Sequence, residues 1–148
     1  MELIMFDSIL VVCTGNICRS PMGERYLQSL LPNKKIDSAG TGSLVGHEAD
    51  PTASRIAQNY GISLSNHCAK QFTSTLGRKY DLILAMEKEH IEKISQIAPE
   101  VRGKTMLFGH WAEYKDIPDP YRKSEEVFTL IFELIKQSGD IWAKKLSV

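Results

Sequence analysis

Apolar residues along this chain follow two alternating patterns. Three short runs, at residues 8–12, 80–86 and 104–108, are almost continuously apolar, which is typical of strands buried on both faces of a parallel sheet. A further strand is expected over residues 35–39. Elsewhere apolar residues recur every three or four positions, which predicts helices over residues 20–31, 50–61, 88–97 and 124–146.

Proline and glycine mark where these elements begin and end. Ser20 and Asp50 each precede a proline, and a capping side chain before a proline favours the first turn of a helix. Gly61 is expected to end the second helix. Residues 40–48, with three glycines, and residues 114–122, with two prolines, are predicted to be loops.

Strands that alternate with helices predict an α/β fold. Right-handed βαβ units would build a central four-stranded parallel sheet with helices on both faces. No repeat, low-complexity tract or linker divides the chain, so residues 1–148 are expected to form a single domain. Sites in such folds lie outside the carboxyl ends of the strands, which is where the residues after the first strand should lie.

Composition narrows the classes of function. Lys and Arg total 18 and Asp and Glu total 18, so the basic surplus of nucleic-acid and polybasic membrane binders is absent. No apolar run reaches the roughly 18 residues of a spanning helix, and the N-terminus lacks the basic start of a signal peptide. The three cysteines form no disulfide framework, which favours a reducing compartment. We therefore expect a cytoplasmic protein, a monomer, that neither binds nucleic acid nor inserts into a membrane.

The segment after the first predicted strand has the features of a phosphate-binding loop. Its sequence is Cys13-Thr14-Gly15-Asn16-Ile17-Cys18-Arg19-Ser20. Between a strand and a helix N-terminus, successive N–H groups and the helix dipole attract an anion. Gly15 is expected to turn the backbone through positive φ, and Asn16 tolerates the left-handed region. Arg19 offers a planar fork for two phosphate oxygens, and in that field the Cys13 thiol should ionise readily and act as a nucleophile.

Spacing alone also allows purely structural roles for two of the residues that could carry the chemistry. Cys13 is compatible with a small buried side chain at a strand end, and Asp119 with ordinary Asp-Pro turn chemistry. Cleavage of a phosphate ester also needs an acid for the leaving oxygen, and Asp119 is the candidate. Cys13 and Cys18 are poorly spaced for a metal and no second cysteine pair follows, so no metal site is expected.

Taken together, the motifs resemble those of the low-molecular-weight protein-tyrosine phosphatase family. The similarity runs from about residue 6 to residue 146. It rests on VVCTGNICRSP at 11–21, DSAGT at 37–41, YDLILAME at 80–87, VRGKTMLFGHW at 101–111 and IPDPYRKS at 117–124. The stretch at 101–111 resembles the bacterial branch associated with capsule and exopolysaccharide genes, whose substrate is a membrane tyrosine autokinase.

The resemblance implies the same fold and a hydrolase that needs no cofactor and no metal. It implies that Cys13 forms a phosphocysteine, Arg19 clamps the phosphoryl oxygens and Asp119 is the general acid. The substrate site would consist of Thr14, Gly15, Asn16, Ile17, Cys18, Ser20, Leu44 and Tyr121. Ser38 and His67 would support the loop. The implied partner is a phosphotyrosine protein, namely the tyrosine-rich tail of the autokinase.

Two positions depart from the eukaryotic members of that family. Leu44 or a neighbour stands where they carry an aromatic residue, and Arg122 follows Tyr121 where they have a second tyrosine. A more open and more basic cleft is therefore expected.

Three other functions are weighed against the phosphatase. An arsenate reductase is disfavoured because Cys68 is the sole downstream cysteine. A phosphocarrier would not need Asp119, and a non-catalytic phosphotyrosine-binding module would need neither Asp119 nor Cys13. Turnover of an aryl phosphate separates all three from a phosphatase.

Cys18 has two interpretations. It is either a small side chain that packs the loop, or a redox partner that traps an oxidised Cys13 as a disulfide before further oxidation.

Overall fold

Four parallel strands form the central sheet of the computed structural model, which describes residues 6–147. The strands are β1 (Ser8–Cys13), β2 (Lys35–Gly40), β3 (Leu82–Ala85) and β4 (Thr105–Leu107), in the spatial order β2-β1-β3-β4. The predicted four-stranded parallel sheet is confirmed. Residues 1–5 and 148, which the single-domain prediction includes, lie outside the described residues.

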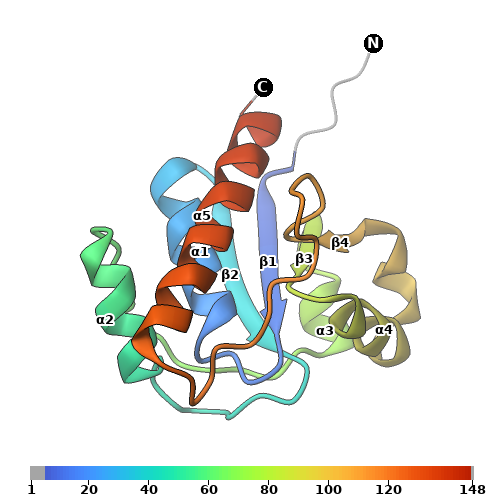
Figure 1. Cartoon of the computed structure of the whole chain (residues 1–148). Coiled ribbons are helices and arrows are strands. Elements are labelled where there is room, and N and C mark those ends of the chain that lie inside the picture. Colours follow the sequence, from blue (N-terminus) through green and yellow to red (C-terminus); the bar gives the residue numbers. More distant parts are fainter. Residues whose placement is uncertain (1–5, 148) are drawn as a thin grey trace.

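Helices cover both faces of this sheet, as predicted (Figure 1). α1 (Arg19–Leu30), α2 (Pro51–Asn59) and α5 (Glu125–Leu146) pack on one face, and α3 (Ser74–Gly77) and α4 (Lys88–Ile97) lie on the other. α3 and the 3₁₀ helix η1 (Pro99–Lys104) were not predicted, because each is too short to show a helical period. No helix within residues 6–147 is long and apolar enough to cross a membrane.

β1 lies between β2 and β3 and divides the core into two layers. Ile9 and Val11 belong to the apolar cluster under α1, α2 and α5, whereas Leu10 and Val12 belong to the cluster under α4. All four side chains are fully buried, and each contributes about 1.5–3 kcal/mol of transfer free energy. Burial on both faces explains the continuous apolar run, and it holds the end of β1 rigidly in place.

The predicted strands at 80–86 and 104–108 are longer than β3 and β4. Tyr80, Met86 and Phe108 are buried, but they lie just outside the strands. Apolar content therefore overestimated the strand lengths, because burial continues past the last paired residue.

The helix caps agree with expectation in one case and disagree in the other. The Asp50 carboxylate accepts the N–H groups of Thr52 and Ala53, and Gly61, at φ +76°, follows the end of α2. Ser20 does not cap α1: the helix begins one residue earlier, at Arg19, and has no side-chain cap. The Ser20 hydroxyl is instead used beneath the loop described next.

Candidate active site

The loop of residues 14–18, between β1 and α1, holds its carbonyl groups turned outward. The carbonyl oxygens of residues 13–17 each accept a hydrogen bond from another segment, in order from Thr41, Gly42, Leu44, His67 and Asp50. By contrast, none of the N–H groups of residues 14–20 donates to an acceptor within residues 6–147. The loop therefore presents its N–H groups, together with the positive end of the α1 dipole, to an anion.

Cys13 is the last residue of β1 and lies at the base of this loop. Its sulfur is 2.9 Å from Ser20 Oγ. Asn16 Nδ2 donates to the same Oγ at 2.8 Å, so the hydroxyl's own proton is free to point at the sulfur. A donated proton stabilises a thiolate, which is why Ser20 faces the sulfur rather than capping α1.

Asn16, rather than Gly15, has the left-handed backbone in this loop. Its φ is 60°, while Gly15 is not among the residues with positive φ, so that expectation for Gly15 was wrong. The buried Asn16 amide donates to Ser20 Oγ and Ser38 Oγ (2.9 Å), and its Oδ1 accepts the Lys70 N–H at 3.0 Å. Every hydrogen-bonding group of this side chain is used, which secures the strained turn.

Ser38 and His67 hold Asn16 from two sides. Ser38 donates its own proton to Glu24 Oε1 at 2.7 Å. His67 Nε2–H donates to the Asn16 carbonyl at 2.6 Å. Burial lowers the pKa of His67, so the ring stays neutral with its proton on Nε2.

Arg19 is a buried cation with fixed partners. Its guanidinium pairs with Glu87 and donates to the Ile117 carbonyl at 2.8 Å. Another nitrogen of the group, Nη2, lies 3.9 Å from Asp119 Oδ2. Glu87 was not predicted, although a carboxylate two residues after the end of β3 lies at the edge where sites of α/β folds form.

His90 was also missed, and it contacts the loop through Thr14. The Glu87 N–H donates to His90 Nδ1 at 3.1 Å, so the ring proton is on Nε2, which lies 2.8 Å from Thr14 Oγ1 and donates to it. Burial, with a smaller effect of the Arg19 cation, lowers the pKa of His90 to about 4. Because Thr14 Oγ1 accepts the hydrogen bond from His90, the hydroxyl proton of Thr14 remains available to a ligand.

A cavity of about 210 Å³ opens above the Cys13 sulfur. Its lining comes from the phosphate loop with the Arg19 side chain, from the loop after β2 and from the loop before α5. The lining residues are Cys13, Thr14, Gly15, Ile17, Cys18, Arg19, Gly42, Leu44, Asp119 and Tyr121. Of the predicted site residues, Asn16, Ser20, Ser38 and His67 lie outside this lining, in the network that supports the loop. Burial raises the pKa of the Cys18 thiol, so Cys18 stays protonated beside Cys13.

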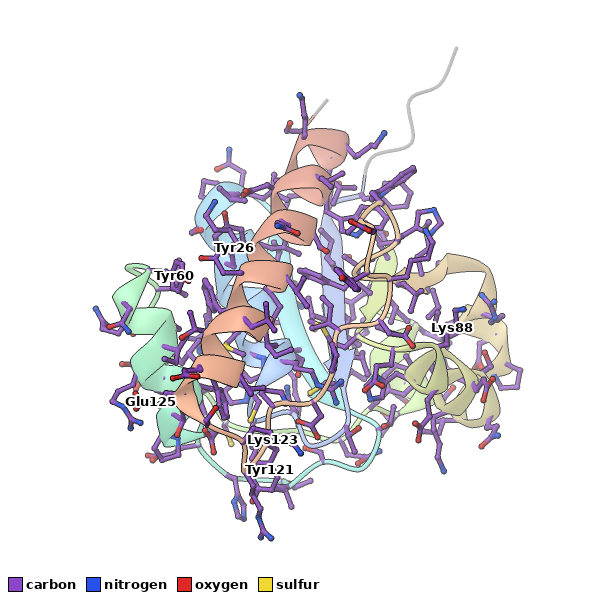
Figure 2. The ribbon with its side chains drawn as sticks, viewed as in Figure 1. Tyr26, Tyr60, Lys88, Tyr121, Lys123 and Glu125 are labelled. Carbon is purple, nitrogen blue, oxygen red and sulfur yellow. The ribbon has the colours of Figure 1, made fainter. Side chains whose placement is uncertain are left out.

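The rim of this cavity is partly exposed and basic. Leu44 and Tyr121 are 40% and 39% exposed, and the Arg122 guanidinium lies over the Tyr121 ring at 5.2 Å. Figure 2 shows Tyr121 and Lys123 together in the loop before α5. Asp119 is half exposed, and its Oδ1 accepts the Tyr121 N–H at 3.0 Å, which orients the carboxylate.

Known proteins are similar to this chain in sequence and in fold. A family model described as low molecular weight phosphotyrosine protein phosphatase matches residues 8–148. A Klebsiella pneumoniae protein named as a low molecular weight protein-tyrosine-phosphatase is 67% identical over 142 residues, which are 96% of this chain and 99% of that protein. The crystal structure of the tyrosine phosphatase Wzb from Escherichia coli K30 in complex with sulphate has a TM-score of 0.95 at 60% identity, covering 96% of this chain and 99% of that one.

Two further structures bear on the ligand. Wzb of Vibrio vulnificus in complex with benzylphosphonate has a TM-score of 0.94 at 55% identity, covering 95% of this chain and 99% of that one. A Cys-to-Ser mutant of the arginine phosphatase YwlE, with a phosphorylated active-site serine, has a TM-score of 0.89 at 28% identity, covering 95% of each chain. The same fold therefore serves phosphatases of two named specificities.

Proposed function

The chain belongs to the low molecular weight phosphotyrosine protein phosphatase family, and we propose that it hydrolyses phosphotyrosine in proteins through a phosphocysteine on Cys13. One observation carries the proposal. The Cys13 sulfur, the Arg19 guanidinium and the Asp119 carboxylate line the same cavity, next to a loop whose N–H groups have no acceptor within residues 6–147. Nucleophile, anion clamp and acid are thus all within reach of one phosphate ester.

In the first step the phosphoryl group is transferred to sulfur. The loop N–H groups and Arg19 bind the equatorial oxygens and stabilise their charge in the transition state. The Cys13 thiolate attacks phosphorus while the bond to the tyrosine oxygen breaks. Asp119 gives its proton to that oxygen, so tyrosine leaves as a neutral phenol.

In the second step water regenerates the enzyme. Asp119, now a carboxylate, takes a proton from water as its oxygen attacks phosphorus. The sulfur–phosphorus bond breaks, phosphate leaves and the Cys13 thiolate re-forms beside the Ser20 proton. Because Arg19 and the amides supply the positive charge, the mechanism uses no metal and no cofactor. The arginine phosphatase with its phosphorylated active-site serine supports covalent transfer in this fold.

The rim favours an aromatic substrate. Ile17, Leu44 and Tyr121 give the cavity apolar walls of a kind that contact a phenyl ring well. The benzylphosphonate complex of the Vibrio vulnificus relative supports this choice over phosphoarginine, because the ligand joins a phenyl group to a phosphonate.

The protein partner is proposed from the rim and from the resemblance to the capsule-associated branch. Arg122 and Lys123, next to Tyr121, suit an acidic flexible segment. We extend the proposal to a specific substrate, the tyrosine-rich tail of a membrane tyrosine autokinase that controls capsule or exopolysaccharide synthesis or export. In this proposal the phosphatase is a monomer and acts in the cytoplasm.

The test separates chemistry from binding. Cys13→Ser should abolish hydrolysis of p-nitrophenyl phosphate and of a phosphotyrosine peptide, yet still bind inorganic phosphate, because the N–H groups and Arg19 remain. Activity is measured by phosphate release, and affinity by isothermal titration calorimetry. Substantial turnover by Cys13→Ser would exclude Cys13 as the nucleophile, and faster hydrolysis of a phosphoarginine peptide than of a phosphotyrosine peptide would overturn the substrate assignment.

A further inference from the structure

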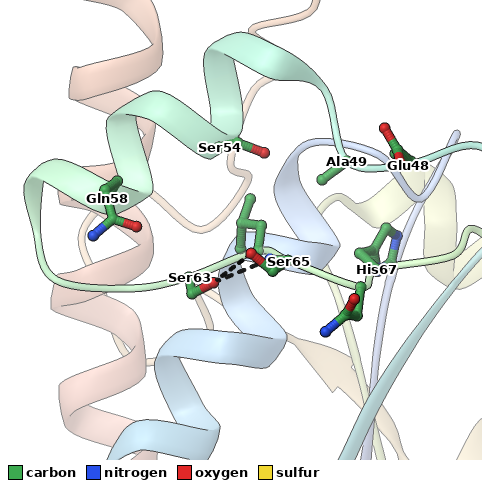
Figure 3. A pocket seen from close by; sticks show the side chains of 9 residues that line it. Glu48, Ala49, Ser54, Gln58, Ser63, Ser65 and His67 are labelled. Carbon is green, nitrogen blue, oxygen red and sulfur yellow. Dashed lines mark hydrogen bonds between the residues drawn. The ribbon is translucent and has the colours of Figure 1, made fainter.

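A second cavity, which we term the serine cavity, lies behind the phosphate loop. It has a volume of about 320 Å³, at the small end of the roughly 300–1,000 Å³ range of small-molecule sites. Its walls come from residues 48–49 before α2, from Ser54 and Gln58 on α2, and from the segment 63–67 that follows this helix (Figure 3). Neither Cys13 nor Arg19 lines it, so it is separate from the cavity above the sulfur.

His67 contributes to this cavity a solvent-accessible imidazole nitrogen that has no protein partner within residues 6–147. His67 is 7% exposed and lines the wall, and Figure 3 shows its ring on the side of the cavity where Glu48 lies. Its Nε2 is bonded to the Asn16 carbonyl, while its Nδ1 has no hydrogen-bond partner within residues 6–147. Because the proton is on Nε2, Nδ1 is a lone-pair acceptor that a ligand hydroxyl can satisfy.

The other lining groups define the ligand chemistry. Three serine hydroxyls (Ser54, Ser63 and Ser65) and the amide groups of Gln58 and Asn66 offer both donors and acceptors. Among the described residues no Lys or Arg side chain lines the cavity, so an anion would meet the Glu48 carboxylate without a compensating cation. No cluster of three potential metal ligands occurs within residues 6–147. Ala49 and Leu64 add a small apolar surface, which a sugar ring covers with its C–H face.

Hydrogen bonds connect the segment 63–67, which forms one wall of the serine cavity, to the phosphate loop by two routes. The direct route runs from His67 to the Asn16 carbonyl. The longer route starts at the Ser63 and Ser65 carbonyls, which accept from Arg25 Nη1 at 3.1 and 2.9 Å.

The longer route then returns to the same asparagine. Arg25 Nε donates to Glu24 Oε2 at 2.8 Å, Glu24 Oε1 accepts from Ser38, and Ser38 accepts from Asn16 Nδ2. The segment 63–67 is therefore hydrogen-bonded directly to Asn16 at one end and connected to it through three other side chains at the other end.

We propose that the serine cavity binds a neutral, polyhydroxylated molecule of monosaccharide size and that this binding tightens the hold of the loop on phosphate. A hydroxyl that donates to Nδ1 polarises the ring and strengthens the bond from Nε2–H to Asn16, since hydrogen bonds in a chain reinforce one another. By linkage, phosphate tightens sugar binding by the same factor. The coupling expected is about fivefold, at the low end of measured couplings.

The test uses D-glucose on the whole protein, followed by NMR of the backbone amides. Glucose should shift the amide signals of Ser63, Ser65 and His67 saturably, and should lower the Kd of inorganic phosphate about fivefold. D-glucuronate, the same ring with a carboxylate, should bind more weakly, and Glu48→Gln should reduce that difference. Phosphate affinity is measured without turnover, so failure of the proposed phosphatase activity and failure of this inference are distinguishable.

Matched variants on α2 control the experiment. Ser54→Trp fills the cavity and should abolish the glucose response, and Gln58→Trp provides a second block at an exposed position. Asn59→Trp, exposed on the same helix and outside the lining, should leave the response intact. No saturable shift, equal loss in Asn59→Trp, or glucose binding without a change in phosphate Kd would each overturn the proposal.

Discussion

At the scale of single residues, the hydrogen-bond partners of the buried side chains in this site determine which atom carries each proton. Oδ1 of Asn16 accepts a backbone N–H, so its Nδ2 must be the donor toward Ser20 and Ser38. Ser20 then has a proton to give the Cys13 sulfur, and Ser38 has one to give Glu24. The branch through Ser20 therefore runs toward the sulfur, which is the direction that stabilises a thiolate, whereas the branch through Ser38 ends at Glu24.

The proposed role of Asp119 as general acid does not follow from its position in the sequence and needs a direct test. Asp119→Asn cannot protonate a leaving oxygen, so turnover of phenyl phosphate should fall by about 10²–10⁴-fold. The loss should be much smaller for p-nitrophenyl phosphate, whose leaving group needs little protonation. Steady-state kcat for the two esters checks this, with Asp116→Asn, in the same loop, as the control. An equal loss for both esters would indicate a structural role.

We expect Cys18 to protect the Cys13 sulfur, because both cysteines line one cavity and neither is in a disulfide. Peroxide would convert a Cys13 thiolate to a sulfenic acid, and the Cys18 thiol would then displace water to form a disulfide. Wild-type inactivation should therefore reverse with dithiothreitol, whereas Cys18→Ser should stay inactive. Exposed Cys68 gives the control Cys68→Ser, which should behave as wild type. Recovery of Cys18→Ser would leave Cys18 as packing alone.

At the level of elements, the site depends on the close approach of two chain segments. β2 ends at Gly40, opposite Cys13 in the parallel register, and the segment after it bonds the phosphate loop. A Cβ on Gly40 would lie 2.2 Å from the Thr14 carbonyl oxygen. This glycine is therefore required by space rather than by φ, which is ordinary there.

Gly40→Ala should displace the loop at Thr14. A shift of about 1 Å in a catalytic group costs on the order of 10²-fold in rate, so a loss of that size in kcat/KM is expected, together with weaker phosphate binding. Gly103→Ala, where a Cβ would meet no atom within 4 Å, is the matched control. Wild-type kinetics in Gly40→Ala would show that the loop tolerates the displacement.

For the whole molecule, two neutral buried histidines link stability to pH. His67 and His90 hold the phosphate loop from different elements, and burial lowers the pKa of both, that of His90 to about 4. In the unfolded chain a histidine takes up its proton near pH 6.5. The unfolded state therefore binds more protons below pH 6.5, and folding loses stability as pH falls.

The free energy of unfolding should accordingly be highest above about pH 6.5 and decline as the pH falls toward 4. Urea unfolding followed by circular dichroism across that range measures it. His90→Asn keeps an acceptor and a donor in place of the ring nitrogens but does not titrate, so it should flatten the decline. Exposed His47→Asn should not. A decline of the same size in His90→Asn would assign the pH dependence to other groups.

Features that depend only on neighbouring residues along the chain could be predicted from the amino-acid sequence. Burial on both faces makes β1 continuously apolar, the Asp50 cap lies within three residues of the N–H groups that donate to it, and the loop from Cys13 to Ser20 is one contiguous segment. Helical and strand periods, caps and anion-binding loops are local physics, so they could be predicted without coordinates.

The distant groups that complete the loop could be identified only from the packed fold. Glu87 lies 68 residues beyond Arg19, and His90 lies 76 residues beyond Thr14, and neither spacing has a pattern. Ser20 has the sequence of a helix cap, but the nearby sulfur and Asn16 draw its hydroxyl away, and Asn16 has the positive φ expected of Gly15. These outcomes follow from the parallel packing of β1, β2 and β3, which brings their carboxyl ends to one edge. Burial there obliges each polar group to find a partner, wherever in the chain that partner lies.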